Sequence, residues 1–136
     1  MYVSKKTEFG LRLMIALARH PDRRLSSEEL AEATAIPRQL TLKLTLSLAK
    51  SGLVKAQRGV GGGLQLACTP AKIALQNIMD AVDPPSALMK RPAHSTRDTS
   101  PAAVARLTLQ AIEVNLERKL KSITLAEIVR EQVGNA

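Results

Sequence analysis

Residues 36–66 have the sequence pattern of a helix followed by a two-stranded hairpin. Pro37 suits the first position of a helix, where its missing N–H leaves no hydrogen bond unmade. Gly52 is placed to end that helix in the left-handed conformation. One apolar stripe is predicted along this helix by leucines that recur four residues apart, at Leu40, Leu44 and Leu48. The other positions predict a polar face, made of Arg38, Gln39, Thr41, Lys43, Thr45 and Ser47.

Two short strands are expected after Gly52, at residues 53–57 and 64–66. The turn between them is Arg58-Gly59-Val60-Gly61-Gly62-Gly63, which is basic and rich in glycine. Glycines let the backbone approach another surface without a side-chain clash. A polar-faced helix followed by a basic-tipped hairpin is typical of a winged helix-turn-helix. The pattern therefore predicts a DNA-binding transcription regulator.

Two helices are expected before this segment. Residues 4–20 predict a buried helix that Ser4 caps and that is apolar nearly all round beyond Phe9. Ser26 and Glu29 form the S-x-x-E capping box of a short second helix that ends near Ala33. Any antiparallel helix pair can show this spacing, and the hairpin that follows favours the helix-turn-helix.

Basic charge is concentrated in the same half of the chain. The formal net charge is +8, and residues 1–66 hold 11 Lys and Arg against 5 Asp and Glu, whereas residues 67–136 hold 9 against 7. This segregation suits a polyanion such as double-stranded DNA better than an evenly solvated basic face. Lys5 and Lys6 oppose the dipole of the first helix, which indicates either phosphate contact or a frayed helix end.

The C-terminal half predicts a short helix over residues 73–82, a loop over 84–101, a long helix from Ser100-Pro101 to about Lys121 and a short last helix capped by Thr124 and Glu127. The long helix has an apolar stripe at Leu109, Ile112, Leu116, Leu120 and Ile123. A second stripe is expected beside it, at Val104, Leu107, Ala111 and Val114.

So broad an apolar surface predicts a homodimer in which the long helix packs against a partner subunit. The alternative is a helix buried between two parts of one monomer. The expected architecture is mainly α with a small β-wing. A winged helix-turn-helix domain is expected over 1–83, a sensor-type loop over 84–100, and a dimerisation helix with a terminal helix over 101–136.

Several classes of protein are disfavoured. With one cysteine, Cys68, no signal-peptide core and no apolar run near ~18 residues, we expect a cytoplasmic protein that does not span a membrane. His20 and His94 lie in no catalytic or metal motif, so no enzyme is expected. Cys68 is expected to be a half-buried small hydrophobe, with a redox-sensing thiol as the alternative.

Four motifs carry a resemblance to a known family: Leu48-Ala49-Lys50-Ser51-Gly52-Leu53-Val54, Arg58-Gly59-Val60-Gly61-Gly62-Gly63, Ile78-Met79-Asp80-Ala81-Val82 and Ile123-Thr124-Leu125-Ala126-Glu127. Through them nearly the whole chain resembles the Rrf-two family of winged-helix transcription regulators, the iron–sulfur cluster regulator and nitric-oxide-sensitive repressor type. Val60 stands where the family usually has proline, and Leu64 where it usually has an aromatic residue. The resemblance implies a homodimeric regulator, expected to be a repressor that binds a palindromic operator.

The resemblance also implies a 2Fe-2S cluster, which sensing members hold through three cysteines in the loop. Residues 84–101 contain none; Ser100-Pro101 falls where the last would be, and His94 near the middle one. Clusters need thiolates or enough imidazole ligands, and Glu8, His94 and the distant Cys68 do not make that set. We therefore predict no cofactor and no metal site.

The helix face and the resemblance together assign the DNA contacts. Gln39 suits adenine, Arg38 or Lys43 suits guanine, and Leu42 suits a thymine methyl group. By the family pattern Arg58 would enter the minor groove, the alternative being a solvated charge. The predicted DNA-binding residues are Lys5, Lys6, Arg38, Gln39, Thr41, Leu42, Lys43, Arg58, Gly59, Gly61, Gly62 and Gly63.

A second function stays open, a winged-helix module that binds a protein instead of DNA. The polar, basic helix face argues against it, because the centre of a protein-binding face is usually more apolar or aromatic.

Overall fold

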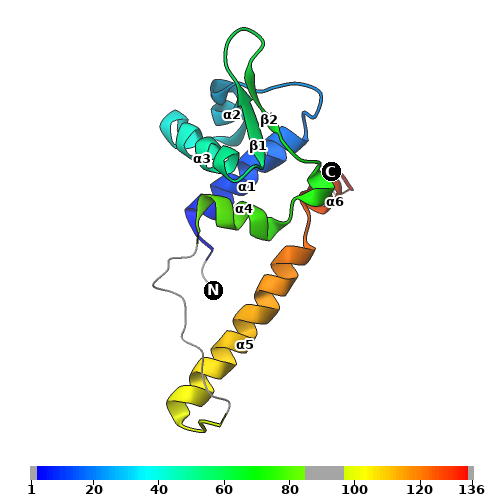
Figure 1. Ribbon diagram of the computed structural model, residues 1–136. Helices are drawn as coiled ribbons and strands as arrows, with labels where there is room; N and C mark the ends of the chain where they lie inside the picture. The colour runs from blue at the N-terminus through cyan, green and yellow to red at the C-terminus, as the bar shows by residue number, and fades with distance from the viewer. Residues whose placement is uncertain (1–2, 85–96, 135–136) are drawn as a thin grey trace.

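The structure, a computed structural model, describes residues 3–84 and 97–134. It consists of a winged-helix head from which one long helix projects (Figure 1). The elements, in chain order, are α1 (Lys5–Ala18), α2 (Ser27–Thr34), α3 (Arg38–Lys50), β1 (Val54–Gln57), β2 (Gly63–Leu66), the 3₁₀ turn η1 (Pro70–Lys72), α4 (Leu75–Val82), α5 (Pro101–Ser122) and α6 (Leu125–Gly134).

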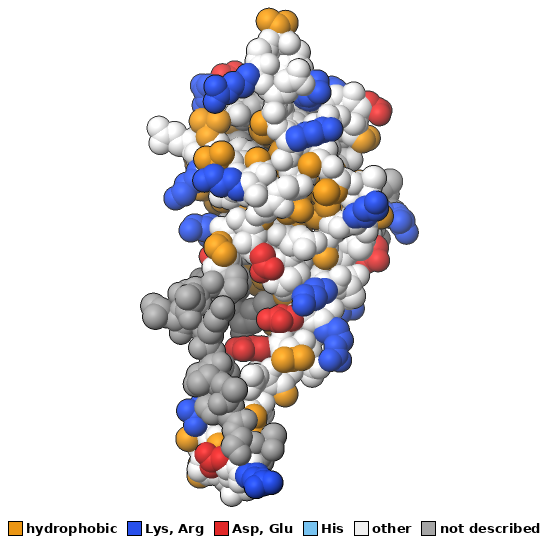
Figure 2. Space-filling view, viewed as in Figure 1, with side chains coloured by type: hydrophobic (Ala, Val, Ile, Leu, Met, Phe, Trp, Pro, Cys, Tyr) orange, Lys and Arg blue, Asp and Glu red, His pale blue; other side chains and the backbone are white. Residues whose placement is uncertain are grey.

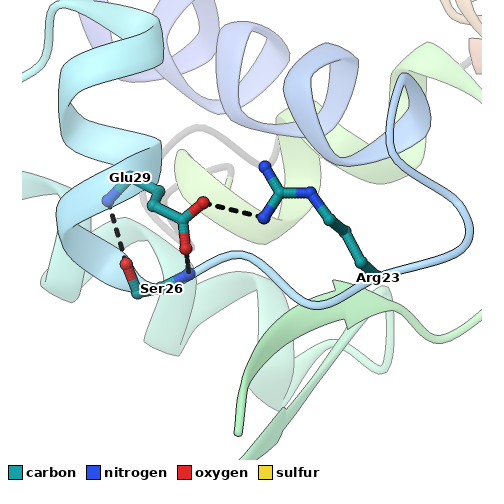
Figure 3. A network of polar contacts seen from close by, with 3 residues as sticks. All are labelled: Arg23, Ser26 and Glu29. Carbon is teal, nitrogen blue, oxygen red and sulfur yellow. Dashed lines mark hydrogen bonds and ion pairs between the residues drawn. The ribbon is translucent and has the colours of Figure 1, made fainter. Parts of the chain in front are cut away.

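Side-chain caps begin the helices where the sequence predicts them. The Ser4 hydroxyl accepts a hydrogen bond from the backbone of α1 at 3.2 Å, and the Ser100 hydroxyl does the same for α5 at 3.2 Å. At α2 the capping box is complete: Glu29 N donates to Ser26 Oγ, and Ser26 N donates to Glu29 Oε1 (Figure 3). These bonds satisfy N–H groups that have no partner within their helix, so they confirm three predicted helix starts.

The core of the head is aliphatic and centres on α1, which packs against α2, α3, α4 and α6. Leu13, Met14 and Leu17 of α1 are buried, together with Leu44 and Leu48 of α3. The predicted apolar stripe of α3 therefore faces the core, with Leu40 partly buried at its edge.

The hairpin is tied to the head by a third extended segment. Strands β1 and β2 pair antiparallel from Val54↔Leu66 to Gln57↔Gly63. Leu25, just before α2, exchanges two backbone hydrogen bonds with Leu64 of β2, at 2.9 and 2.7 Å. The base of the wing is thus fixed beside α2, while its tip projects away from the head (Figure 1).

The starts of two helices differ from the sequence prediction. Helix α3 begins at Arg38, with Pro37 as its N-cap residue. The helix expected from residue 73 begins at Leu75, because Ile73 is extended and its carbonyl accepts a hydrogen bond from Leu125 N at 2.8 Å. The pairing is reciprocal, since Leu75 N donates to Ile123 O at 2.8 Å. A contact between distant segments thus overrides the local helical pattern.

Candidate nucleic-acid interface

Helix α3 presents one exposed face to its surroundings. Four predicted DNA contacts share this face, and the apolar side chains Leu42 and Leu46 are 47% and 57% exposed on it. The alternation of cations, an amide and leucines can both hydrogen-bond base edges and contact methyl groups in a major groove. The exposed residues of α3 are Arg38, Gln39, Leu42, Lys43, Leu46 and Lys50.

Thr41, predicted among the DNA contacts, is buried, and the structure contradicts its assignment. The side chain is 0% exposed, and its hydroxyl donates to Pro37 O at 3.1 Å. Thr45, also expected on the polar face, is 4% exposed and donates to Thr41 O at 2.8 Å. A threonine that bonds a carbonyl one turn earlier can be buried without leaving its hydroxyl unsatisfied. We therefore remove Thr41 from the candidate contacts.

Arg38 begins the exposed face of α3 and contacts α2. Its Nη2 lies 3.0 Å from Glu28 Oε1, and the two side chains are 65% and 69% exposed. Gln39 and Lys43 follow on the same exposed face. The first turn of α3 contains no acidic residue that would repel a phosphate or a base acceptor.

The tip of the wing is fully exposed and carries one cation, Arg58. Val60, two residues further on, is 109% exposed, so no described part of the chain covers the tip. Figure 2 shows further Lys and Arg side chains on the head beside the hairpin. An exposed loop with an arginine, projecting beyond a basic surface, has the shape and charge to enter a groove of DNA.

The glycines of this turn have two different roles. A Cβ on Gly62 would lie 2.2 Å from Gln57 O, and a Cβ on Gly63 would lie 2.8 Å from Leu25 O. These two glycines are therefore needed to fold and dock the hairpin, whatever the wing contacts. Gly59 and Gly61, with φ of 94° and 77°, have open space around them. The backbone at Gly59 and Gly61 is the part of the turn that remains available to a phosphate.

Lys5 and Lys6, at the start of α1, are both exposed. Lys5 Nζ lies 5.8 Å from the centre of the Phe9 ring, within the range of a cation–π contact. In the view of Figure 1, the start of α1 and the tip of the wing lie at opposite ends of the head, with α3 between them. The predicted cations thus extend along the head instead of forming one cluster.

The predicted dimerisation stripe of α5 is only partly available to a partner. Leu109 and Ile112 are 51% and 57% exposed, and Leu116 is half-buried. Leu120 is 9% exposed, which contradicts its assignment to a partner contact. Ile123, at the bridge to α4, is likewise partly covered by its own chain. The end of the stripe packs on the head because α5 joins α6 there.

The second apolar stripe of α5 does not lie beside the first. Val104 and Val114 are 50% and 48% exposed. At about 100° of rotation per residue, Val114 lies roughly 160° around the helix from Ile112. Helix α5 therefore exposes apolar side chains on two sides.

The donor set does not fit an iron–sulfur cluster. Cys68, the one cysteine, is exposed, not half-buried as expected, and its Sγ lies 3.6 Å from Gly52 O. Glu8 is held 2.8 Å from Arg12 in an ion pair, and His94 lies outside the described residues. Within residues 3–84 and 97–134, no three His, Cys, Asp or Glu side chains group so as to hold a metal ion.

In the same parts of the chain, no helix is long and apolar enough to cross a membrane.

The winged head, the exposed basic face of α3 and the arginine at the wing tip define the chain as a winged helix-turn-helix protein of the DNA-binding class. Residues 3–131 match the family model Rrf2, described as an iron-dependent transcriptional regulator. The chain therefore belongs to the Rrf2 (Rrf-two) family, a family of transcriptional regulators and not of enzymes.

Relatives agree with this assignment. The Synechocystis sp. (strain ATCC 27184 / PCC 6803 / Kazusa) protein slr0846, named as an HTH-type transcriptional regulator, is 36% identical over 84 residues. The match covers 61% of this chain and 57% of that protein. Among solved structures, T. potens IscR has a TM-score of 0.77 at 27% identity, covering 97% of this chain and 88% of its own. CymR, the global cysteine regulator of B. subtilis, has a TM-score of 0.77 at 26% identity, covering 96% and 98%.

Proposed function

We propose that this protein is a homodimeric repressor that binds a palindromic DNA operator, with no iron–sulfur cluster required for binding. The observation that carries the proposal is the exposed face of α3, where Arg38, Gln39 and Lys43 are open to solvent beside a projecting wing. Arginine, glutamine and lysine are the side chains that read guanine and adenine in the major groove. As a regulator of transcription it would act in the cytoplasm, where the DNA lies.

The dimer part of the proposal is supported by α5. Leu109 and Ile112 on one side, with Val104 and Val114 on the other, leave apolar surface that a monomer would expose to water. Two α5 helices packed together would place two heads on one duplex, and two heads match the two half-sites of a palindrome.

A second candidate function is a winged-helix module that binds a protein, which Leu42 and Leu46 favour because they make the face of α3 more apolar than its sequence predicts. The lysines on the same face, Lys43 and Lys50, weigh against it, because lysine is depleted at protein interfaces.

Selection of purified, metal-free protein on a random duplex library at two salt concentrations tests the proposal. We expect a palindromic consensus and an affinity that falls steeply with salt, as counterions are released from the phosphates. Recovery of no consensus, with salt-insensitive binding to a protein partner, would overturn the proposal in favour of the second function. A single unrepeated half-site would overturn the palindrome.

A further inference from the structure

Glu28 lies beside the arginine that begins the exposed face of α3. Glu28 Oε1 and Arg38 Nη2 are 3.0 Å apart, close enough for a charge-assisted hydrogen bond. Glu29, the residue after Glu28, has other partners: it caps α2 together with Ser26 and pairs with Arg23 at 2.8 Å (Figure 3). The two acidic residues in the first turn of α2 thus have separate roles: one holds the helix start and the other holds Arg38.

The pair with Glu28 restricts Arg38 without occupying it. A guanidinium has five N–H donors in one plane, so a contact at Nη2 leaves other donors available for the O6 and N7 acceptors of guanine. Both side chains are about two-thirds exposed, and water screens their attraction. The contact is therefore strong enough to favour one orientation of the arginine and weak enough to adjust when DNA binds.

Glu28 also places a negative charge at the edge of the candidate interface. A carboxylate repels the phosphates of any duplex, whatever its sequence. An oriented Arg38, in contrast, is favourable mainly where a guanine is within reach. The combination opposes binding to unrelated DNA and supports binding to a matching site.

We propose that Glu28 is a positioning residue that determines specificity: it orients Arg38 for guanine readout and lowers the affinity for unrelated DNA. The inference rests on the proposed function, because it requires α3 to lie in the major groove.

The test measures wild type, E28Q, R38A and the double variant at one salt concentration. The probes are the selected operator, the operator with each base pair changed in turn, and an unrelated duplex. E28Q keeps the size and the acceptor of the side chain but removes its charge. We expect the operator-to-unrelated affinity ratio to fall by about two- to fivefold, the size of an exposed ion pair. The preference for one G·C pair per half-site should weaken, and it should be the pair that R38A no longer distinguishes.

Because Glu28 acts through Arg38, the double variant should have the same base preferences as R38A. Glu32→Gln is the matched control, an exposed carboxylate on the same helix one turn further along. It should leave every base preference unchanged. An E28Q variant with wild-type base preferences, or one that behaves as E32Q does, overturns the inference and leaves the proposed function intact. A wild-type protein that selects no sequence overturns the proposed function, and the inference with it.

Discussion

The arginines of the head differ in what holds them in the free protein. Arg12 and Arg23 each lie 2.8 Å from a glutamate oxygen. Arg38 has a similar partner at 3.0 Å. Arg58, at the wing tip, has no ion-pair partner within the described parts of the chain and is exposed. Binding DNA through Arg58 therefore costs no broken ion pair.

The first prediction concerns Arg58. If its side chain enters a groove, Arg58→Ala should weaken operator binding by about 1–3 kcal/mol, measured by fluorescence anisotropy at fixed salt. Arg106→Ala, an exposed arginine on α5, is the control and should have little effect. Unchanged operator affinity in the Arg58 variant would show that the charge is only solvated.

The role of Leu42 can be tested by changing the DNA as well as the protein. If its exposed side chain contacts a thymine methyl group, replacing that thymine by uracil should cost about 0.8 kcal/mol, the value of one buried methyl-sized group. In Leu42→Ala the same replacement should cost almost nothing. The affinities are measured with one uracil at each operator position in turn. If no position shows a penalty that depends on Leu42, this side chain does not read thymine.

At the scale of elements, the sequence predicted the features that depend on neighbouring residues alone, such as helix starts. Ser4, Ser26 and Ser100 begin helices because each satisfies N–H groups of its own first turn, which is visible in the sequence. The exposed side of α3 was less predictable. Thr41 looks polar in the sequence, but its hydroxyl bonds within the helix, so burial costs it little. Leu46 looks apolar and yet lies outside the core.

The remaining differences come from contacts between distant segments. The residues around Ile73 in the sequence do not predict that its carbonyl accepts a hydrogen bond from Leu125 N. The predicted apolar stripe of α5 is likewise buried at one end and exposed at the other. The head covers the end with Leu120 and leaves Ile112 exposed. In the sequence both leucine and isoleucine simply continue one apolar period.

The capping box of α2 makes a prediction about pH. A hydrogen bond from Arg23, and then the backbone hydrogen bond at Ser26, lower the pKa of the Glu29 carboxyl below its ordinary value of 4.5. The stabilisation it provides is therefore complete above pH 4.5 and is lost as the pH falls through the lowered pKa. In urea unfolding, wild type should be more stable than Glu29→Gln at neutral pH, and the difference should shrink in acid. A difference that stays constant with pH would contradict the ionised cap.

Helix α5 makes a prediction about assembly. If Leu109 and Ile112 pack against a second subunit, Ile112→Asp should convert a dimer into monomers, because a charge would be buried in an apolar contact. Analytical ultracentrifugation measures the change. Val60→Asp is the matched control, since Val60 is also an exposed apolar residue and lies far from α5 at the wing tip. A wild-type monomer, or a dimer that survives Ile112→Asp, would argue against this face.

At the scale of the whole molecule, the basic charge and the exposed apolar surface of α5 lie in different parts of the protein. The winged head contains most of the basic excess. Helix α5 projects from the head (Figure 1) and exposes apolar side chains on two sides. A dimer through α5 would hold two basic heads apart on one duplex. Affinity would then depend on many phosphate contacts at once, spread over the head.

Lys5 and Lys6 test that extended electrostatic surface. Each lysine that neutralises a phosphate contributes about 0.9 to the slope of log affinity against log salt. Because the proposed homodimer carries each lysine twice, Lys5→Ala and Lys6→Ala should each flatten the slope by about 1.8 units. They should weaken binding to operator and unrelated DNA alike, because phosphate contacts carry no sequence information. Lys72→Ala, at the exposed η1 turn, is the control for loss of one positive charge. If the lysines of α1 alter the slope no more than Lys72 does, the DNA contacts end at α3 and the wing, and the start of α1 is simply an exposed helix end.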